Sequence, residues 1–189
     1  DELIVREKQM FDDGKLIEYN ETFNGRFYNT IKFPIFRDDS TPMLAGFTID
    51  ITDRKLAEEA LKENEEKLLT LINSSPDVIC FKDAENRWIQ ANRSILELYQ
   101  LQNVDYFNKS EKELAACTSD IFKEVLENCN ISDELAWASE TGIRTEEIIP
   151  DINGLLHVYD IIKLPLYYSD KKRKGLVVYG REITERKMA

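Results

Sequence analysis

The stretch Asp50-Ile51-Thr52-Asp53-Arg54-Lys55 organises the chain, because its pattern occurs twice. The order acid, Ile, Thr, acid, Arg, Lys returns 132 residues later as Glu182-Ile183-Thr184-Glu185-Arg186-Lys187. A second repeated stretch, Ile31-Lys32-Phe33-Pro34-Ile35, matches Ile162-Lys163-Leu164-Pro165-Leu166 at a distance of 131 residues. A period of this length is typical of a tandem domain and too long for a solenoid repeat. The sequence therefore predicts two copies of one module, the first without its N-terminal half.

Each copy of the six-residue motif stands between an apolar strand and a charged, helix-forming stretch. The threonine is expected to be a helix N-cap whose hydroxyl accepts from a free amide of the first turn. The acid before it and the arginine four residues after that acid are expected to form a salt bridge across the junction. We interpret this corner as a signal-transmission joint, with an ordinary strand-to-helix corner as the alternative. The expected transmission residues are Asp50, Thr52, Arg54, Glu182, Thr184 and Arg186.

The succession of strand, proline, short polar turn, strand and Asp-Ile-Thr-x-Arg-Lys resembles the C-terminal end of PAS domains in bacterial and archaeal signalling proteins. The first copy has the family's usual Asp50, whereas the second has Glu182 at that position. The resemblance covers residues 74–187 as a complete domain and residues 1–53 as a C-terminal half-module, joined by a linker helix at 54–73. It implies an α+β fold with a five-stranded antiparallel sheet in the order 2-1-5-4-3. Helices on one face of that sheet would enclose a small cavity.

The composition of the chain limits the kinds of partner that it can bind. The chain has 36 acidic residues against 25 lysines and arginines, a net charge of −11, which argues against nucleic-acid binding because a polyanion requires clustered basic residues. No apolar run approaches the roughly 20 residues of a membrane span. Three widely separated cysteines are expected to be free thiols in a reducing cytoplasm. The start at Asp1 predicts a piece of a longer polypeptide with a linked output domain.

The linker helix carries a heptad pattern on one side. Leu61, Asn64, Leu68 and Leu71 follow one another at alternating steps of three and four residues, as in a coiled-coil seam. An asparagine in such a seam fixes the register of two parallel strands. We expect a homodimer through this seam, with an amphipathic helix packed on its own sheet as the alternative. Further helices are predicted at 1–12, 120–128 and 132–141.

Signals for an enzyme or a metal site are absent from the sequence. His157 is the single histidine, and no phosphate-binding, dinucleotide-binding or nucleophile-elbow motif occurs among seven glycines. We therefore predict no catalytic residues, no metal site and no enzymatic activity within this chain. The resemblance adds that the flavin-binding stretch of photosensory PAS members is missing and that helix 132–141 lacks the histidine of haem-binding members. No cofactor is expected, and a small-molecule ligand stays open.

A candidate ligand site follows from strand alternation. The positions apolar in both copies of the penultimate strand (residues 158, 162, 164 and 166 in the second copy) are taken as the helix-covered face, and Asp160 shares their parity. Tyr179 and Arg181 in the last strand would meet Asp160 in the cavity. The resemblance adds Trp137 on the preceding helix, because PAS members that bind flavin adenine dinucleotide use a tryptophan near the cavity; a core or interface tryptophan is the alternative. The alternative is a structural ion pair between Asp160 and Arg181 in a filled core.

The function predicted is that of a sensory and dimerisation PAS segment in a signal-transduction protein of the histidine kinase or diguanylate cyclase type. A ligand or partner signal would pass through the repeated corner. The alternative is a ligand-free PAS spacer or protein-interaction module.

Overall fold

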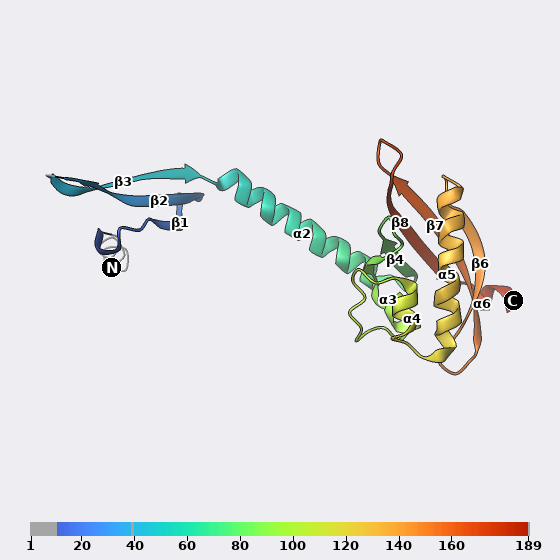
Figure 1. Ribbon diagram of the computed structural model, residues 1–189. Helices are drawn as coiled ribbons and strands as arrows, with labels where there is room; N and C mark the ends of the chain where they lie inside the picture. The colour runs from blue at the N-terminus through green and yellow to red at the C-terminus, as the bar shows by residue number, and fades with distance from the viewer. Residues whose placement is uncertain (1–10, 39, 189) are drawn as a thin grey trace. The chain divides into compact units, whose positions relative to one another are not determined.

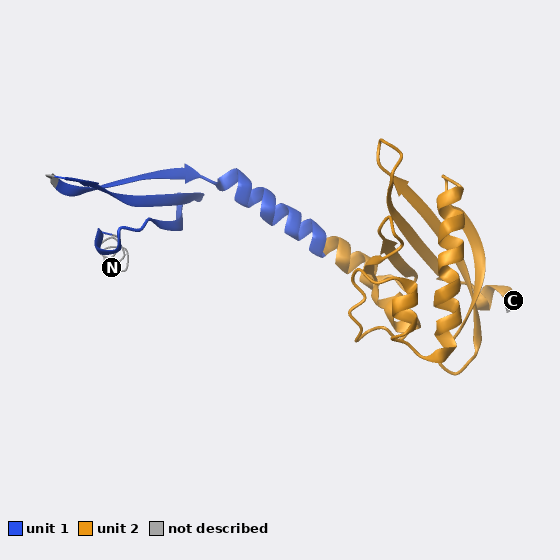
Figure 2. Cartoon of the chain, in the orientation of Figure 1, with its two compact units in different colours: residues 1–66 blue, residues 67–189 orange. Residues whose placement is uncertain are grey.

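The structure, a computed structural model, describes residues 11–38 and 40–188. The chain divides into two compact units, residues 1–66 and 67–189, and the division falls inside helix α2 (Figure 2). The elements of unit 1, with the shared helix, are β1 (Ile17–Phe23), β2 (Arg26–Arg37), β3 (Ser40–Asp50) and α2 (Thr52–Ser74). Those of unit 2 are β4 (Val78–Lys82), β5 (Trp88–Ala91), α3 (Arg93–Leu98), α4 (Glu111–Ala115), α5 (Asp120–Ala138), β6 (Ile143–Pro150), β7 (Leu156–Tyr167), β8 (Arg173–Glu182) and α6 (Thr184–Met188).

Unit 1 is an antiparallel meander of three strands in the order β1-β2-β3 (Figure 1). Asn24 and Gly25 close the first hairpin with φ of 48° and 74°, the left-handed conformation that a two-residue hairpin turn requires. Among residues 11–38 and 41–66, Thr30 alone is buried. The helix predicted at 1–12 lies almost wholly outside the described residues.

Unit 2 is built around a five-stranded antiparallel sheet in the order β5-β4-β8-β7-β6. Numbered within the unit, this is the predicted order 2-1-5-4-3, so the predicted α+β, PAS-like fold is confirmed. Helix α5 runs across one face of the sheet near β6 and β7 (Figure 1). The buried apolar residues of the described chain all belong to this unit.

The predicted inward face of β7 is wrong by one residue. The buried residues of this strand are Tyr159, Ile161, Lys163 and Pro165, whereas the residues at 158, 160, 162, 164 and 166 are half-buried or exposed. Both faces of the strand carry aliphatic residues, so their alternation does not distinguish the two sides. Lys163 is the misleading position, because a lysine ordinarily indicates the solvent face.

One helix replaces the two that the sequence predicted at 120–128 and 132–141. Helix α5 continues from Asp120 to Ala138, through the polar stretch that suggested a break. Its buried side chains Leu126, Asp133 and Trp137 recur at helical spacing on one face, so packing against the sheet extends the helix across weak helix formers.

The buried side chain of Asn92 joins three segments at the start of unit 2. Its Oδ1 accepts from the backbone N–H of Ile79 at 2.9 Å and from that of Ile95, where it caps α3. Its Nδ2 donates to the carbonyls of Ile72 at 2.9 Å and Asp77 at 2.8 Å. The end of α2 is thereby attached to β4 and α3 by hydrogen bonds that a buried amide can satisfy completely.

Candidate functional site

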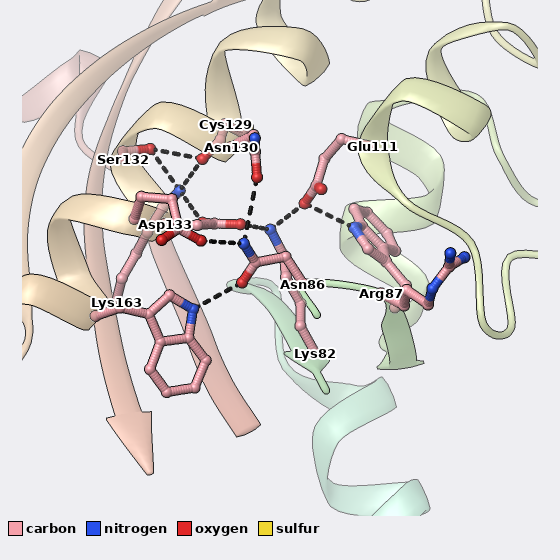
Figure 3. A network of polar contacts seen from close by, with 12 residues as sticks. Lys82, Asn86, Arg87, Glu111, Cys129, Asn130, Ser132, Asp133 and Lys163 are labelled. Atoms are coloured by element: carbon pink, nitrogen blue, oxygen red, sulfur yellow. Dashed lines mark hydrogen bonds and ion pairs between the residues drawn. The ribbon is translucent and has the colours of Figure 1, made fainter. Parts of the chain in front are cut away.

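Four charged side chains lie buried on the helix-covered face of the sheet in unit 2. They come from four elements: Lys82 from β4, Glu111 from α4, Asp133 from α5 and Lys163 from β7. Their relative exposures are 2%, 3%, 0% and 1%, respectively. Figure 3 shows these four side chains converging on one another. We call them the core charge network.

Asp133 lies between the two lysines. Its Oδ2 accepts from Lys82 Nζ at 2.5 Å, and its Oδ1 accepts from Lys163 Nζ at 2.6 Å. Lys82 also donates to Glu111 Oε1, and the same oxygen accepts the indole N–H of Trp88 at 3.1 Å. The two carboxylates are therefore held by positive charge and by hydrogen bonds together, which are the strong contacts available to a buried carboxylate.

The network is electrically balanced, with two positive and two negative groups. Lys163 finds acceptors for its three N–H bonds in Asp133, Ser132 Oγ at 2.6 Å and the carbonyl of Cys129 at 3.2 Å. Burial by itself lowers the pKa of Lys82, but the negative charges of Asp133 and Glu111 outweigh it and hold that pKa above its usual value. Lys82 is thus a permanent cation, and removing one partner would leave a buried charge uncompensated.

Local structure explains how each member reaches the core. Lys82 alternates with the buried Val78 and Cys80 on one face of β4. Glu111 is the first residue of α4, which Ser110 and Glu113 fix by a reciprocal capping box. Asp133 falls on the buried face of α5, and Lys163 alternates with the buried residues of β7. Each acid or lysine therefore occupies an ordinary core position of its element.

The cavity enclosed by the sheet and helices is small, about 20 Å³. Such a volume holds about one water molecule. Its walls combine three members of the core charge network and the half-buried acid Glu147 with mostly apolar residues of the sheet and helices. The lining residues are Val78, Cys80, Lys82, Trp88, Ile95, Tyr99, Glu111, Cys129, Glu147, Ile149, Ile161, Lys163 and Val178. Side chains therefore fill most of the space in which a larger ligand would sit.

Trp137, predicted as a ligand contact, belongs to a second polar cluster and does not line this cavity. Its indole N–H donates to Asn86 Oδ1 at 2.8 Å. Asn86 in turn donates to Glu134 at 2.9 Å, and Glu134 forms an ion pair with Arg173 at 2.7 Å. The guanidinium of Arg173 lies 4.7 Å from the centre of the Trp137 ring, a cation–π contact. Trp137 is thus held in a structural cluster.

Asp160, Tyr179 and Arg181 lie on the opposite face of the sheet, so their predicted meeting in the cavity is wrong. Asp160 binds the guanidinium of Arg144 at 2.6 and 2.8 Å, although it is the cross-strand neighbour of Arg181. Arg181 binds Asp77 at 2.7 and 3.0 Å, and the Tyr179 hydroxyl donates to the same carboxylate. The error arose because the wrong face of β7 was taken as the helix-covered one, and the matching face of β8 was chosen with it.

The sequence reasoning missed the core charge network. Acidic and basic residues are abundant in this chain, and most of them are solvated, so composition does not single out four that are buried. One signal was available: Lys163 and Lys32 occupy the same place in the repeated Ile-Lys-x-Pro stretch. A lysine repeated inside an otherwise apolar motif indicates a specific partner.

The predicted transmission corners are built alike in the two units. Thr52 Oγ1 accepts from the backbone N–H of Phe27 at 3.0 Å, and Thr184 Oγ1 accepts from that of Val158 at 3.0 Å. Each threonine hydroxyl donates to the acid two residues earlier, Thr52 at 2.5 Å and Thr184 at 3.0 Å. Each corner therefore joins the start of a helix to the neighbouring strand.

The internal contacts of the corner differ from the prediction in two respects. The threonine hydroxyl satisfies a strand amide and does not cap the helix, because the neighbouring strand presents its free N–H directly to it. The predicted salt bridges to Arg54 and Arg186 are also wrong. Arg54 pairs with Glu58 at 2.8 Å, and Arg186 lines a surface groove beside Asp160.

The acid of each corner pairs instead with a basic residue on the adjacent strand. This residue comes directly before the one whose backbone N–H binds the threonine. Asp50 binds Arg26 at 3.0 Å, and Glu182 accepts from His157 Nδ1 at 2.6 Å. Arg26 and His157 precede Phe27 and Val158, so they occupy equivalent positions in the two copies. The same architecture therefore uses an arginine guanidinium in one unit and a histidine imidazole in the other.

The sequence profile of the PAS fold matches residues 72–188. The chain belongs to the PAS family. The PAS segment is similar to the aerobic respiration control sensor protein ArcB of Escherichia coli K12, with 28% identity over 122 residues. That match covers 64% of this chain and 15% of ArcB, so the chain spans only a small part of the length of this relative.

Solved structures share the fold at low sequence identity. The PAS domain of Bordetella pertussis BvgS matches 69% of this chain and 93% of its own length, with a TM-score of 0.52 and 18% identity. A phage VqmA in complex with DPO matches 70% of this chain and 58% of its own, with a TM-score of 0.54 and 19% identity. None of the helices in the described parts of the chain is long and apolar enough to cross a membrane.

Proposed function

We propose that unit 2 is a sensory PAS module of a cytoplasmic signal-transduction protein, of the histidine kinase or diguanylate cyclase type. Its signal passes from the sheet through the corner at Glu182, Thr184 and Arg186 to helix α6. The similarity to a protein named as a respiration control sensor supports the sensory assignment. The output activity belongs to a linked domain, and unit 2 itself acts without catalysis.

The observation that carries this proposal is the repeated corner. Thr184 binds the N–H of β7, while Glu182 at the end of β8 binds both Thr184 and His157 at the start of β7. A shift of β7 against β8 therefore changes the contacts at the first residue of α6. A ligand or partner moves this equilibrium only if it binds the two arrangements with different affinity.

Glu182→Ala in the complete protein tests the relay. We expect the output activity to change while unit 2 keeps a cooperative unfolding transition, followed by the fluorescence of Trp88 and Trp137 and lowered by about 1 kcal/mol or less because the Glu182 side chain is 46% exposed. Glu185→Ala is the matched control, since Glu185 is an exposed acid of helix α6, three residues after Glu182. Wild-type output from a folded Glu182→Ala protein would overturn the proposed relay.

We further propose that α2 forms a parallel homodimer through Leu61, Asn64, Leu68 and Leu71. The three leucines are 61%, 61% and 66% exposed within one chain, so an apolar strip is available for a second copy. Analytical ultracentrifugation should give a dimer for the wild type and a monomer for Leu61→Asp/Leu68→Asp. A wild-type protein that stays monomeric at high concentration would contradict this proposal.

A ligand-free spacer or interaction module is the second candidate. The cavity of about 20 Å³ favours it, because few small molecules other than water fit such a space. Native mass spectrometry distinguishes the candidates: additional mass per protomer that is lost on denaturation supports a sensor with a resident ligand. A clean protein mass favours the spacer.

A further inference from the structure

The small cavity and a surface groove of unit 2 meet at one side chain. The groove lies among the β4–β5 turn, α4 and α5, and its lining residues are Glu85, Asn86, Ser110, Glu111, Lys112, Glu127 and Asn130. Glu111 alone is common to this lining and to that of the cavity. Within the core charge network, Glu111 is therefore the member that also borders the surface groove.

Glu111 occupies a receptor for a carboxylate. Its Oε1 accepts from the Lys82 ammonium and from the Trp88 indole N–H, and both donors are themselves buried. An ammonium and a fixed N–H donor that converge on one oxygen provide charge-assisted recognition of a carboxylate. The two donors come from β4 and β5, whereas the acid that binds them is carried by the five-residue helix α4.

If the Glu111 side chain left the network, a negative charge and a hydrogen-bond acceptor would be missing there. Lys82 and Lys163 would then share the single charge of Asp133, and the Trp88 N–H would have no acceptor. A buried site with one excess positive charge and an unpaired donor favours an anion that accepts hydrogen bonds, and it disfavours neutral molecules and cations. The side chain of glutamate beyond its Cα has the composition of propionate, which sets the size of a replacement.

We propose that the core charge network binds short-chain monocarboxylates of two or three carbons in exchange for the Glu111 side chain, which moves into the groove. The ligand carboxylate binds Lys82 and Trp88, and its alkyl group takes the space vacated by Glu111 together with the cavity of about 20 Å³. In the groove the displaced acid meets the acids Glu85 and Glu127 as well as Lys112, and it exchanges a buried ion pair for a solvated one, so the exchange is weak. This inference names a ligand class for the sensor of the proposed function.

Indole resonances provide the first test on the wild-type chain. Trp88 and Trp137 each give one indole N–H signal in an ¹⁵N-correlation spectrum, and only the Trp88 group contacts Glu111. Titration with acetate should shift the Trp88 signal saturably and leave the Trp137 signal unchanged. Acetamide, which has the same shape without the charge, should shift neither. A Trp88 signal that acetate leaves unmoved, or that acetamide moves equally, would overturn the proposal.

Glu111→Ala provides the second test, because this substitution removes the atoms of an acetate. We expect acetate to bind this variant about tenfold more tightly than the wild type, since no internal acid competes, and to raise its melting temperature. Glu127→Ala, which changes an exposed acid of the same groove, should respond as the wild type does. A folded Glu111→Ala protein without tighter acetate binding would overturn the proposal, and the wild-type titration decides if the variant does not fold.

The two proposals fail separately. Loss of the acetate response leaves the Glu182→Ala relay experiment unaffected, because the relay depends on contacts between β7, β8 and α6. A saturable acetate response with unchanged output in Glu182→Ala would retain the ligand class and remove the relay.

Discussion

The three-stranded meanders of the two units have the same register but different surroundings. Lys32 pairs with Gly46 across β2 and β3, and Lys163 pairs with Val178 at the equivalent position across β7 and β8. Lys163 is 1% exposed and bound to Asp133 of α5, whereas Lys32 is half-buried and lies 5.8 Å from the ring centre of Tyr19. Two strands with the same Ile-Lys-x-Pro pattern therefore differ in the burial of their lysine, and the buried lysine is the one that pairs with an acid of α5.

The corners at the ends of the same meanders show the opposite behaviour. Both corners form the strand-to-threonine and threonine-to-acid hydrogen bonds, although the lysine of the adjacent strand is fully buried in unit 2 and half-buried in unit 1. These contacts involve two neighbouring strands and one helix start, all within a short distance along the sheet. The comparison shows that the corner is a local structure, while the core charge network depends on the whole of unit 2.

The largest expected effect is that of Asp133→Ala. Both lysines of the core charge network would lose their shared partner, and breaking a buried ion pair in this way costs about 3–5 kcal/mol. Urea unfolding followed by tryptophan fluorescence measures this loss, because Trp88 and Trp137 both belong to unit 2. Asp170→Ala, an exposed acid in the β7–β8 turn, is the control and should change the unfolding free energy little. A loss below about 1 kcal/mol would contradict the buried network.

Matched lysine substitutions sharpen the comparison between the meanders. Lys163→Met should lower the unfolding free energy of unit 2 by about 1–3 kcal/mol, less than Asp133→Ala, because Asp133 keeps its hydrogen bond from Lys82 whereas Asp133→Ala takes the shared partner from both lysines. Lys32→Met should leave the tryptophan-monitored transition at its wild-type midpoint. Equal effects of the two substitutions on that transition would contradict the finding that Lys163, and not Lys32, belongs to the core of unit 2.

Matched threonine substitutions should affect the two corners alike. Thr184→Val and Thr52→Val each remove the acceptor of one strand N–H, at a cost of about 1 kcal/mol or less because both corners are partly exposed. Hydrogen exchange should accelerate at Val158 in the first variant and at Phe27 in the second. Thr141→Val, at an exposed loop threonine, should change neither amide. Faster amide exchange in only one of the two variants would contradict the structural equivalence of the two corners.

The smallest expected effect concerns the carboxyl pKa values of Glu182 and Asp50, which are lowered for different reasons. The pKa of Glu182 lies below its ordinary value chiefly because of the hydrogen bond from His157, whereas that of Asp50 is lowered chiefly by the Thr52 hydroxyl and backbone N–H. A depressed carboxyl pKa stabilises the fold above the unfolded pKa, and this contribution is lost as the pH falls through the folded value. Both corners should therefore weaken on acidification below about pH 4.5.

Replacing the basic partner of each acid, His157 or Arg26, tests this difference in the origin of the two pKa shifts. His157→Gln should move the pKa of Glu182 back toward its ordinary value by more than Arg26→Gln moves the pKa of Asp50, because Thr52 remains in the second case. Carboxyl ¹³C shifts followed by NMR over the acid range measure both values. A larger change at Asp50 than at Glu182 would reverse the assignment of the two causes.

The repeat carried most of the information about the fold. Two short stretches at nearly equal spacing, together with the resemblance of the Asp-Ile-Thr stretch, were sufficient to predict the sheet order of unit 2. The interpretation of residues 1–53 as a half-module stays a prediction. The corner was located correctly, but its partners were not, because sequence spacing favoured Arg54 and Arg186 while the contacts came from Arg26 and His157 on the adjacent strand.

The amino-acid sequence by itself determined the repeated strands, the turns and the place of each corner, because these depend on residue type and on neighbours along the chain or across one hairpin. Only the tertiary structure decided which face of β7 is buried and that Lys82, Glu111, Asp133 and Lys163 meet. The physical reason is that the free energy of a buried charge depends on its partners. Those partners come from β4, α4, α5 and β7, which folding brings together from positions as far as 81 residues apart.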